Sequence, residues 1–98
     1  MLADLWNAFR RPPVRAFIAK MCAGYEGTLK RLPDLYCRIA CPTFVLWAGQ
    51  DKHFPPRHAE RLHAAIAGSR LEILPGAAHW MPWYCAEEVA ARLHDFLA

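Results

Sequence analysis

The sequence predicts an α/β fold in which a strand, a helix, a parallel strand and a final helix follow a set of shorter helices. Two observations support this prediction. Apolar runs rich in β-forming residues span residues 43–48 and 71–74, and apolar residues recur at helical spacing around them. The hydrophobic fraction of 55% is also high enough to form a core, which argues against a disordered chain.

Residues 1–36 form the first predicted region and contain only short helices. Apolar residues at helical spacing predict one helix over residues 2–9 and another over 14–23, with two prolines between them. Two glycines then precede a third, weaker helical stretch around Leu32. No motif with a known chemistry falls in this region.

Residues 37–98 form the second predicted region and contain both strands. The strand at 43–48 has no polar face, which is typical of a parallel sheet covered on both sides. Helical spacing predicts a helix over 57–67 and a last helix over about 86–97, and the second strand lies between them at 71–74. A strand, a helix and a strand within about 30 residues have the size of a βαβ unit with a right-handed crossover.

Two polar residues follow the predicted strands and are the candidate catalytic residues. Asp51 comes shortly after the first strand, and His79 comes shortly after the second. Ligand sites of parallel sheets form beyond the carboxyl ends of the strands, so both residues are expected at one edge. A carboxylate beside an imidazole would fix the imidazole tautomer for general-base catalysis. Each residue alone could instead end a turn or bond a nearby carbonyl.

The order of these motifs resembles the C-terminal portion of the α/β-hydrolase family over about residues 32–98. The motifs that carry the resemblance are, in order, IACPT before an apolar strand, AGQD after it, a helix, and a second strand ending in PGAAHW before a final helix. The resemblance implies a partial α/β-hydrolase fold, with residues 1–36 as a cap-like remnant. It also implies that Asp51 is the catalytic acid, that His79 is the general base, and that no cofactor is needed.

The nucleophile of that family is absent from these 98 residues. The family places it in a G-x-S-x-G turn, but the single serine, Ser69, lies at the start of the second strand. The loop that would stabilise an oxyanion is missing as well. After the histidine, Tyr84 and Ala86 stand where the family often has an acid and a proline.

Aromatic residues gather in the sequence around the two catalytic candidates. Phe54 follows Asp51, and Trp80 and Trp83 follow His79. The resemblance implies that such residues line a pocket for an acyl or alkyl group. Packing of these loops onto the core is the alternative interpretation.

Several other classes of function are not supported by the sequence. A net charge of +3 without a clustered basic face argues against nucleic-acid binding, and no apolar run approaches the roughly 18 residues of a membrane span. Cys37 and Cys41 do not have the spacing of a zinc site, and no metal is predicted. The N-terminus does not resemble a secretory leader, so a cytoplasmic location with reduced thiols is expected.

The resemblance therefore implies an esterase-like hydrolase that acts on a small-molecule ester or acyl substrate in the complete enzyme. The chain would supply the acid and the histidine, and by itself would be inactive. It could pair with an N-terminal hydrolase half or self-associate, because two strands alone bury little surface. The alternative is a catalytically inactive hydrolase remnant that acts as a binding or interaction module.

Overall fold

The computed structural model describes residues 2–98 and divides the chain into two compact units. The division lies between Asp34 and Leu35, close to the boundary predicted after residue 36. The second unit carries both strands and both candidate catalytic residues.

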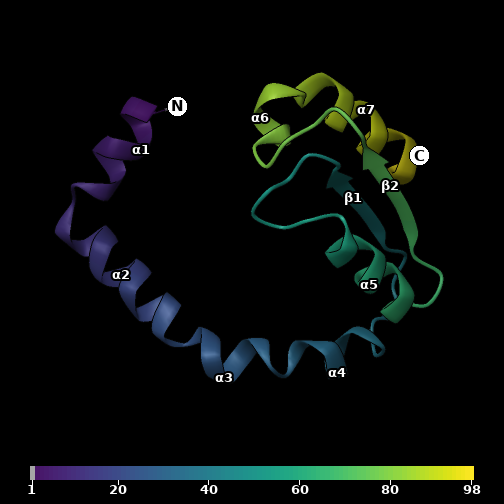
Figure 1. The fold of residues 1–98 in the computed structure, drawn as a ribbon, viewed down its shortest axis with the longest axis horizontal. Coiled ribbons are helices and arrows are strands. Elements are labelled where there is room, and N and C mark those ends of the chain that lie inside the picture. The colour runs from purple at the N-terminus through teal and green to yellow at the C-terminus, as the bar shows by residue number, and fades with distance from the viewer. Residues whose placement is uncertain (1) are drawn as a thin grey trace. The chain divides into compact units, whose positions relative to one another are not determined.

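The first unit is helical, as its spacing of apolar residues predicts. It contains α1 (Leu2–Phe9), α2 (Pro12–Ala23) and α3 (Tyr25–Leu29), and α4 (Leu32–Tyr36) crosses into the second unit (Figure 1). Helix α2 starts at its two prolines and not after them, because the first turn of a helix tolerates proline. No side chain of these four helices is buried.

Besides the end of α4, the second unit contains two strands and three helices. They are β1 (Phe44–Ala48), α5 (Arg57–Ala65), β2 (Arg70–Leu74), α6 (Met81–Tyr84) and α7 (Ala86–Leu97). The strands pair in parallel with Phe44 opposite Arg70 and Ala48 opposite Leu74. The predicted βαβ unit and final helix are confirmed, and α6 is an addition that the apolar spacing did not indicate.

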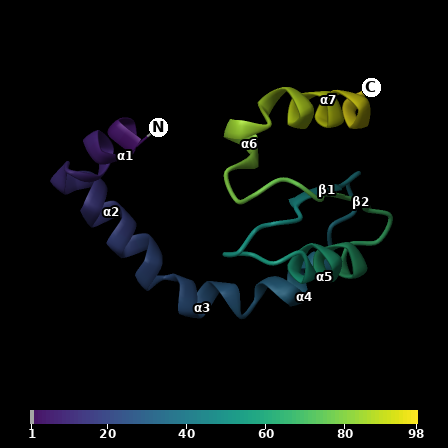
Figure 2. The ribbon, with the colours of Figure 1, turned by 45° about the horizontal axis from the view of Figure 1, so that its top comes forward.

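Helices α5 and α7 cover opposite faces of the two-stranded sheet, as Figure 2 shows. On the α7 side the rings of Phe44 and Phe96 lie 5.3 Å apart between centroids. Glu72 accepts a hydrogen bond from Arg92 on the same side. Because side chains alternate along a strand, this face is formed by every second residue of β1 and β2.

The core continues on this face toward the carboxyl ends of the strands. Ala48 and Leu74 are buried there with Ala77 and Met81, and Val89 of α7 packs against them. Helix α6 begins at Met81, so this cluster fixes the start of the helix that follows the loop carrying His79.

The α5 side of the sheet holds the other buried residues. Val45 of β1 is buried, as are Ala59 of α5 and Ile66 at the end of that helix. Ala59 has no exposed surface at all, which indicates that α5 lies close against the strands at this residue.

None of the helices in residues 2–98 has the length and apolar character that crossing a membrane requires.

We predict that Ala59→Leu destabilises the fold by about 1–3 kcal/mol, because the added methyl groups have no space between α5 and the sheet. Urea unfolding followed by circular dichroism measures the loss. Ala64→Leu is the control, since Ala64 lies exposed on the same helix. Equal effects of the two substitutions would show that α5 does not pack through Ala59.

Candidate active site

Two loops at the carboxyl edge of the sheet carry the candidate site. The first follows β1 and contains Asp51, and the second follows β2 and contains His79. Because the strands are parallel and adjacent, both loops emerge at the same edge. The structure brings these two residues together in the arrangement that the sequence predicts.

Hydrogen bonds continue the pairing of the strands into the loops. The backbone N–H of Gly49 donates to the carbonyl of Leu74 at 2.8 Å, and that of Gln50 donates to the carbonyl of Ala77 at 2.8 Å. The side-chain amide of Gln50 also donates to the carbonyl of Pro75 at 3.2 Å. These bonds set the separation of the two loops before either catalytic candidate is reached.

Gly49 is the residue that lets the loops approach this closely. A Cβ atom at this position would lie 2.8 Å from the Cα of Pro75 and 3.0 Å from the carbonyl oxygens of Leu74 and Pro75. All of these neighbours are backbone atoms, which cannot move aside without distorting the second loop. The requirement for glycine here is therefore steric.

The carboxylate of Asp51 is held through both of its oxygens. Oδ1 accepts hydrogen bonds from the backbone N–H groups of His53 and Phe54, each at 2.9 Å. Oδ2 lies 2.9 Å from Nδ1 of His79. The side chain of Asp51 is only 8% exposed, whereas that of His79 is 33% exposed. The acid is thus fixed and largely covered, and the imidazole remains accessible.

These contacts keep Asp51 ionised. Desolvation by burial acts to raise its pKa, but the hydrogen bonds from Phe54, His79 and His53 outweigh it. The pKa of Asp51 is therefore lowered from its ordinary value. An ionised carboxylate only accepts hydrogen bonds, so Nδ1 of His79 must carry the proton in this pair. The neutral imidazole then has an unprotonated Nε2 that can accept a proton from another group.

Aromatic side chains surround the imidazole of His79. The Phe54 ring stacks on it with centroids 5.6 Å apart, and the Trp80 ring meets it edge-on at 5.5 Å. Trp47 of β1 donates from Nε1 to the carbonyl of Phe54 at 2.8 Å, which ties this loop to the sheet. Asp51, Phe54 and His79 line a shallow hollow of about 190 Å³ whose other walls are apolar.

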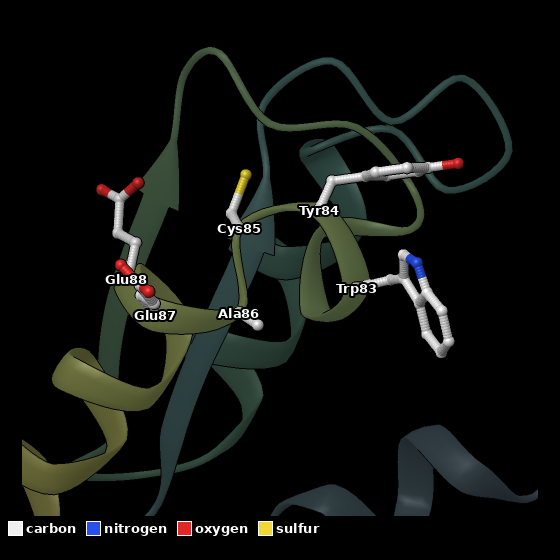
Figure 3. A pocket seen from close by; sticks show the side chains of 6 residues that line it. All are labelled: Trp83, Tyr84, Cys85, Ala86, Glu87 and Glu88. Carbon is white, nitrogen blue, oxygen red and sulfur yellow. The ribbon is translucent and has the colours of Figure 1, made fainter. Parts of the chain in front are cut away.

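Trp83, the third aromatic residue of the predicted pocket, lies in a different place. It lines a separate hollow of about 530 Å³ at the junction of α6 and α7, together with Tyr84, Cys85, Ala86, Glu87 and Glu88. Figure 3 shows Trp83 and Tyr84 on one side of Cys85 and the two glutamates on the other. The structure therefore groups Phe54 and Trp80 with His79 but does not group Trp83 with them.

His53 is not among the residues predicted for the site, yet its ring lies against that of His79. The two imidazole centroids are 4.9 Å apart and the rings are inclined by 64°. His53 lies two residues after Asp51, and this position is the one sequence feature that could have suggested the contact. Within residues 2–98 the histidines, cysteines and acids form no group of three that could hold a metal ion.

Comparison with known proteins places this geometry in context. Residues 1–92 match the alpha/beta hydrolase family. A 2-hydroxy-6-oxononadienedioate/2-hydroxy-6-oxononatrienedioate hydrolase of Klebsiella pneumoniae is 36% identical over 76 residues, which cover 74% of this chain and 26% of that protein. The human serine hydrolase BPHL is 28% identical over an alignment that covers 94% of this chain and 36% of the relative.

A solved structure is also similar. It is a serine hydrolase involved in carbazole degradation, the CarC enzyme, with a TM-score of 0.64 and 28% identity. The similarity covers 66% of this chain and 25% of that one. The chain thus spans about a quarter to a third of the length of these relatives.

We predict that Gly49→Ala destabilises the fold by about 2 kcal/mol, because the new Cβ overlaps the backbone at Pro75. Gly76→Ala is the matched control, since a Cβ at Gly76 meets nothing within 4 Å. Urea unfolding of the two variants measures the difference. A Gly49 variant as stable as the Gly76 variant would contradict the close approach of the loops.

The lowered pKa of Asp51 predicts how stability depends on pH. A carboxylate whose pKa is lower in the folded state stabilises the fold above its unfolded pKa of about 3.9. That contribution is lost as the pH falls through the folded value. The stability difference between the wild type and Asp51→Asn should therefore shrink as the pH is lowered from neutral into this acid range. Urea unfolding across the range measures it, and a difference independent of pH would contradict the prediction.

Proposed function

Because the chain belongs to the α/β-hydrolase family, we propose that Asp51 and His79 are the acid and the general base of a hydrolytic triad. The nucleophile would come from a segment outside these 98 residues. The observation that carries this proposal is the 2.9 Å bond between Oδ2 of Asp51 and Nδ1 of His79. That bond fixes the tautomer and leaves Nε2 for the hydroxyl group of the nucleophile.

The proposed reaction uses the pair in two steps. Nε2 of His79 takes the proton of the nucleophile as its oxygen attacks the carbonyl carbon of the substrate, and then returns that proton to the leaving group. Water attacks the acyl intermediate in the second step with the same proton transfers. Asp51 stabilises the imidazolium formed each time, and its two backbone hydrogen bonds keep it oriented without rearrangement.

We propose a small molecule with an ester, thioester or similar acyl bond as the substrate. The apolar walls of the hollow beside His79, with Phe54 among them, support an apolar group near the scissile bond. The name of the Klebsiella relative gives a dienedioate as the substrate of that enzyme. Hydrolysis of such compounds therefore belongs in the same set of assays as hydrolysis of short-chain esters.

We propose that an N-terminal hydrolase half, and not a second copy of this chain, supplies the nucleophile. The relatives carry much more chain than these residues, which supports a partner segment of that kind. Large apolar side chains such as Trp6 and Phe17 are more than two-thirds exposed and would pack against it.

A cytoplasmic location is also proposed, and free thiols at Cys22 and Cys85 are compatible with it.

The assay should use the chain expressed together with the segment that carries the nucleophile. His79→Ala should lower kcat by about 10³-fold or more, and Asp51→Asn by about 10³- to 10⁴-fold through the wrong tautomer. His94→Ala is the control, because His94 is an exposed histidine of α7. Turnover of p-nitrophenyl esters and of dienedioates measures the effects.

Three outcomes would contradict the proposal. Full activity of the His79 variant would exclude it as the base, and a loss below about tenfold in the Asp51 variant would point to another acid. Absence of turnover by the wild type with every substrate would favour an inactive hydrolase that serves as a binding module.

A further inference from the structure

His53 is an ionisable group beside His79 that the proposed mechanism does not use. The two rings are in edge contact with centroids 4.9 Å apart. The backbone N–H of His53 also donates to Oδ1 of Asp51. His53 therefore contacts both members of the pair, one through its ring and the other through its backbone.

We propose that His53 is a positioning residue whose charge sets the pH range over which His79 can act as a base. This inference rests on the proposed function for its catalytic meaning. A histidine ring carries a positive charge when it is protonated, so His53 can place a cation beside His79. A cation beside His79 opposes the arrival of a second proton on that ring, and therefore preserves the neutral base at lower pH.

The other ionisable groups around the pair do not offer the same effect. Asp51 is already bonded to Nδ1 and favours the cationic form of His79. The ring of His58 contacts Phe54, not His79, and Phe54 itself stacks on His79. Lys52 is exposed on the same loop, and Tyr84 is exposed on α6. His53 is thus the ionisable side chain, besides Asp51, with a described contact to the His79 ring.

The size of the effect follows from Coulomb's law. Two unit charges about 5 Å apart in a water-like medium shift a titration midpoint by about half a pH unit. His53 is exposed, so the water-like value applies and salt should reduce it.

The test is a charge series at residue 53, namely His53→Arg, His53→Asn and His53→Glu. Every variant keeps the backbone N–H that binds Asp51, so the turn can form in each. The titration of His79 is followed by NMR of ¹³C-labelled histidine rings in the protein that includes the nucleophile segment, and His79→Gln assigns the signal. His94→Arg controls for a change in total charge, since His94 lies on α7.

The midpoint for His79 should fall from Glu to Asn to the wild type and then to Arg at position 53. Neighbouring midpoints should differ by up to about half a pH unit, with smaller differences at high salt. The His94 variant should leave the midpoint in place. The acid limb of kcat/KM should move in the same order.

Equal midpoints for the Arg and Glu variants would overturn the proposal. The NMR measurement needs no turnover, so it tests the role of His53 separately from the proposed hydrolytic function. An ordered series without hydrolysis would support the role of His53 and reject the proposed function. Hydrolysis without an ordered series would do the reverse.

Discussion

The site depends on the hydrogen-bonded pairing of β1 and β2, which continues beyond the last strand residues. The bonds from Gly49 and Gln50 to the second loop hold two chain segments together that are far apart in sequence. Glycine is needed where the segments approach most closely. Without this contact, Asp51 and His79 would be two polar residues on separate loops. With it, their separation is set by the geometry of the sheet.

The electrostatics of the pair follow from the same backbone. Asp51 is covered, yet it stays ionised because two N–H groups of its own turn and the ring of His79 all donate to it. Such a carboxylate is already oriented before any proton is transferred. Its lowered pKa and the fixed tautomer of His79 are therefore two consequences of one local arrangement.

The two units differ in how completely they bury their apolar residues. In the second unit, α5 and α7 each cover one face of a sheet that would be marginal by itself. In the first unit, no residue of α1, α2 or α3 is buried, although these helices carry large apolar side chains. The N-terminal hydrolase half proposed above would pack against this apolar surface. This agrees with a chain that covers a fraction of the length of its relatives.

The sequence by itself determined both strands, most of the helices and the candidate pair. The spacing of apolar residues marked α5 and α7, because burial of one helix face imposes that period, and continuous apolar runs marked both strands. The parallel order of the strands then placed Asp51 and His79 at one edge. The spacing did not reveal α6, which has only four residues and a proline, too few for a period to appear.

Tertiary structure alone decided which side chains meet His79. Phe54, Trp80 and Trp83 looked equivalent in the sequence, but α6 begins between the last two, and Trp83 lies in another hollow. His53 was not predicted for the site, and it reaches His79 because the turn around Asp51 brings its ring to the second loop. The direction of a side chain beyond a turn depends on backbone angles and packing, and the order of residue types does not record these.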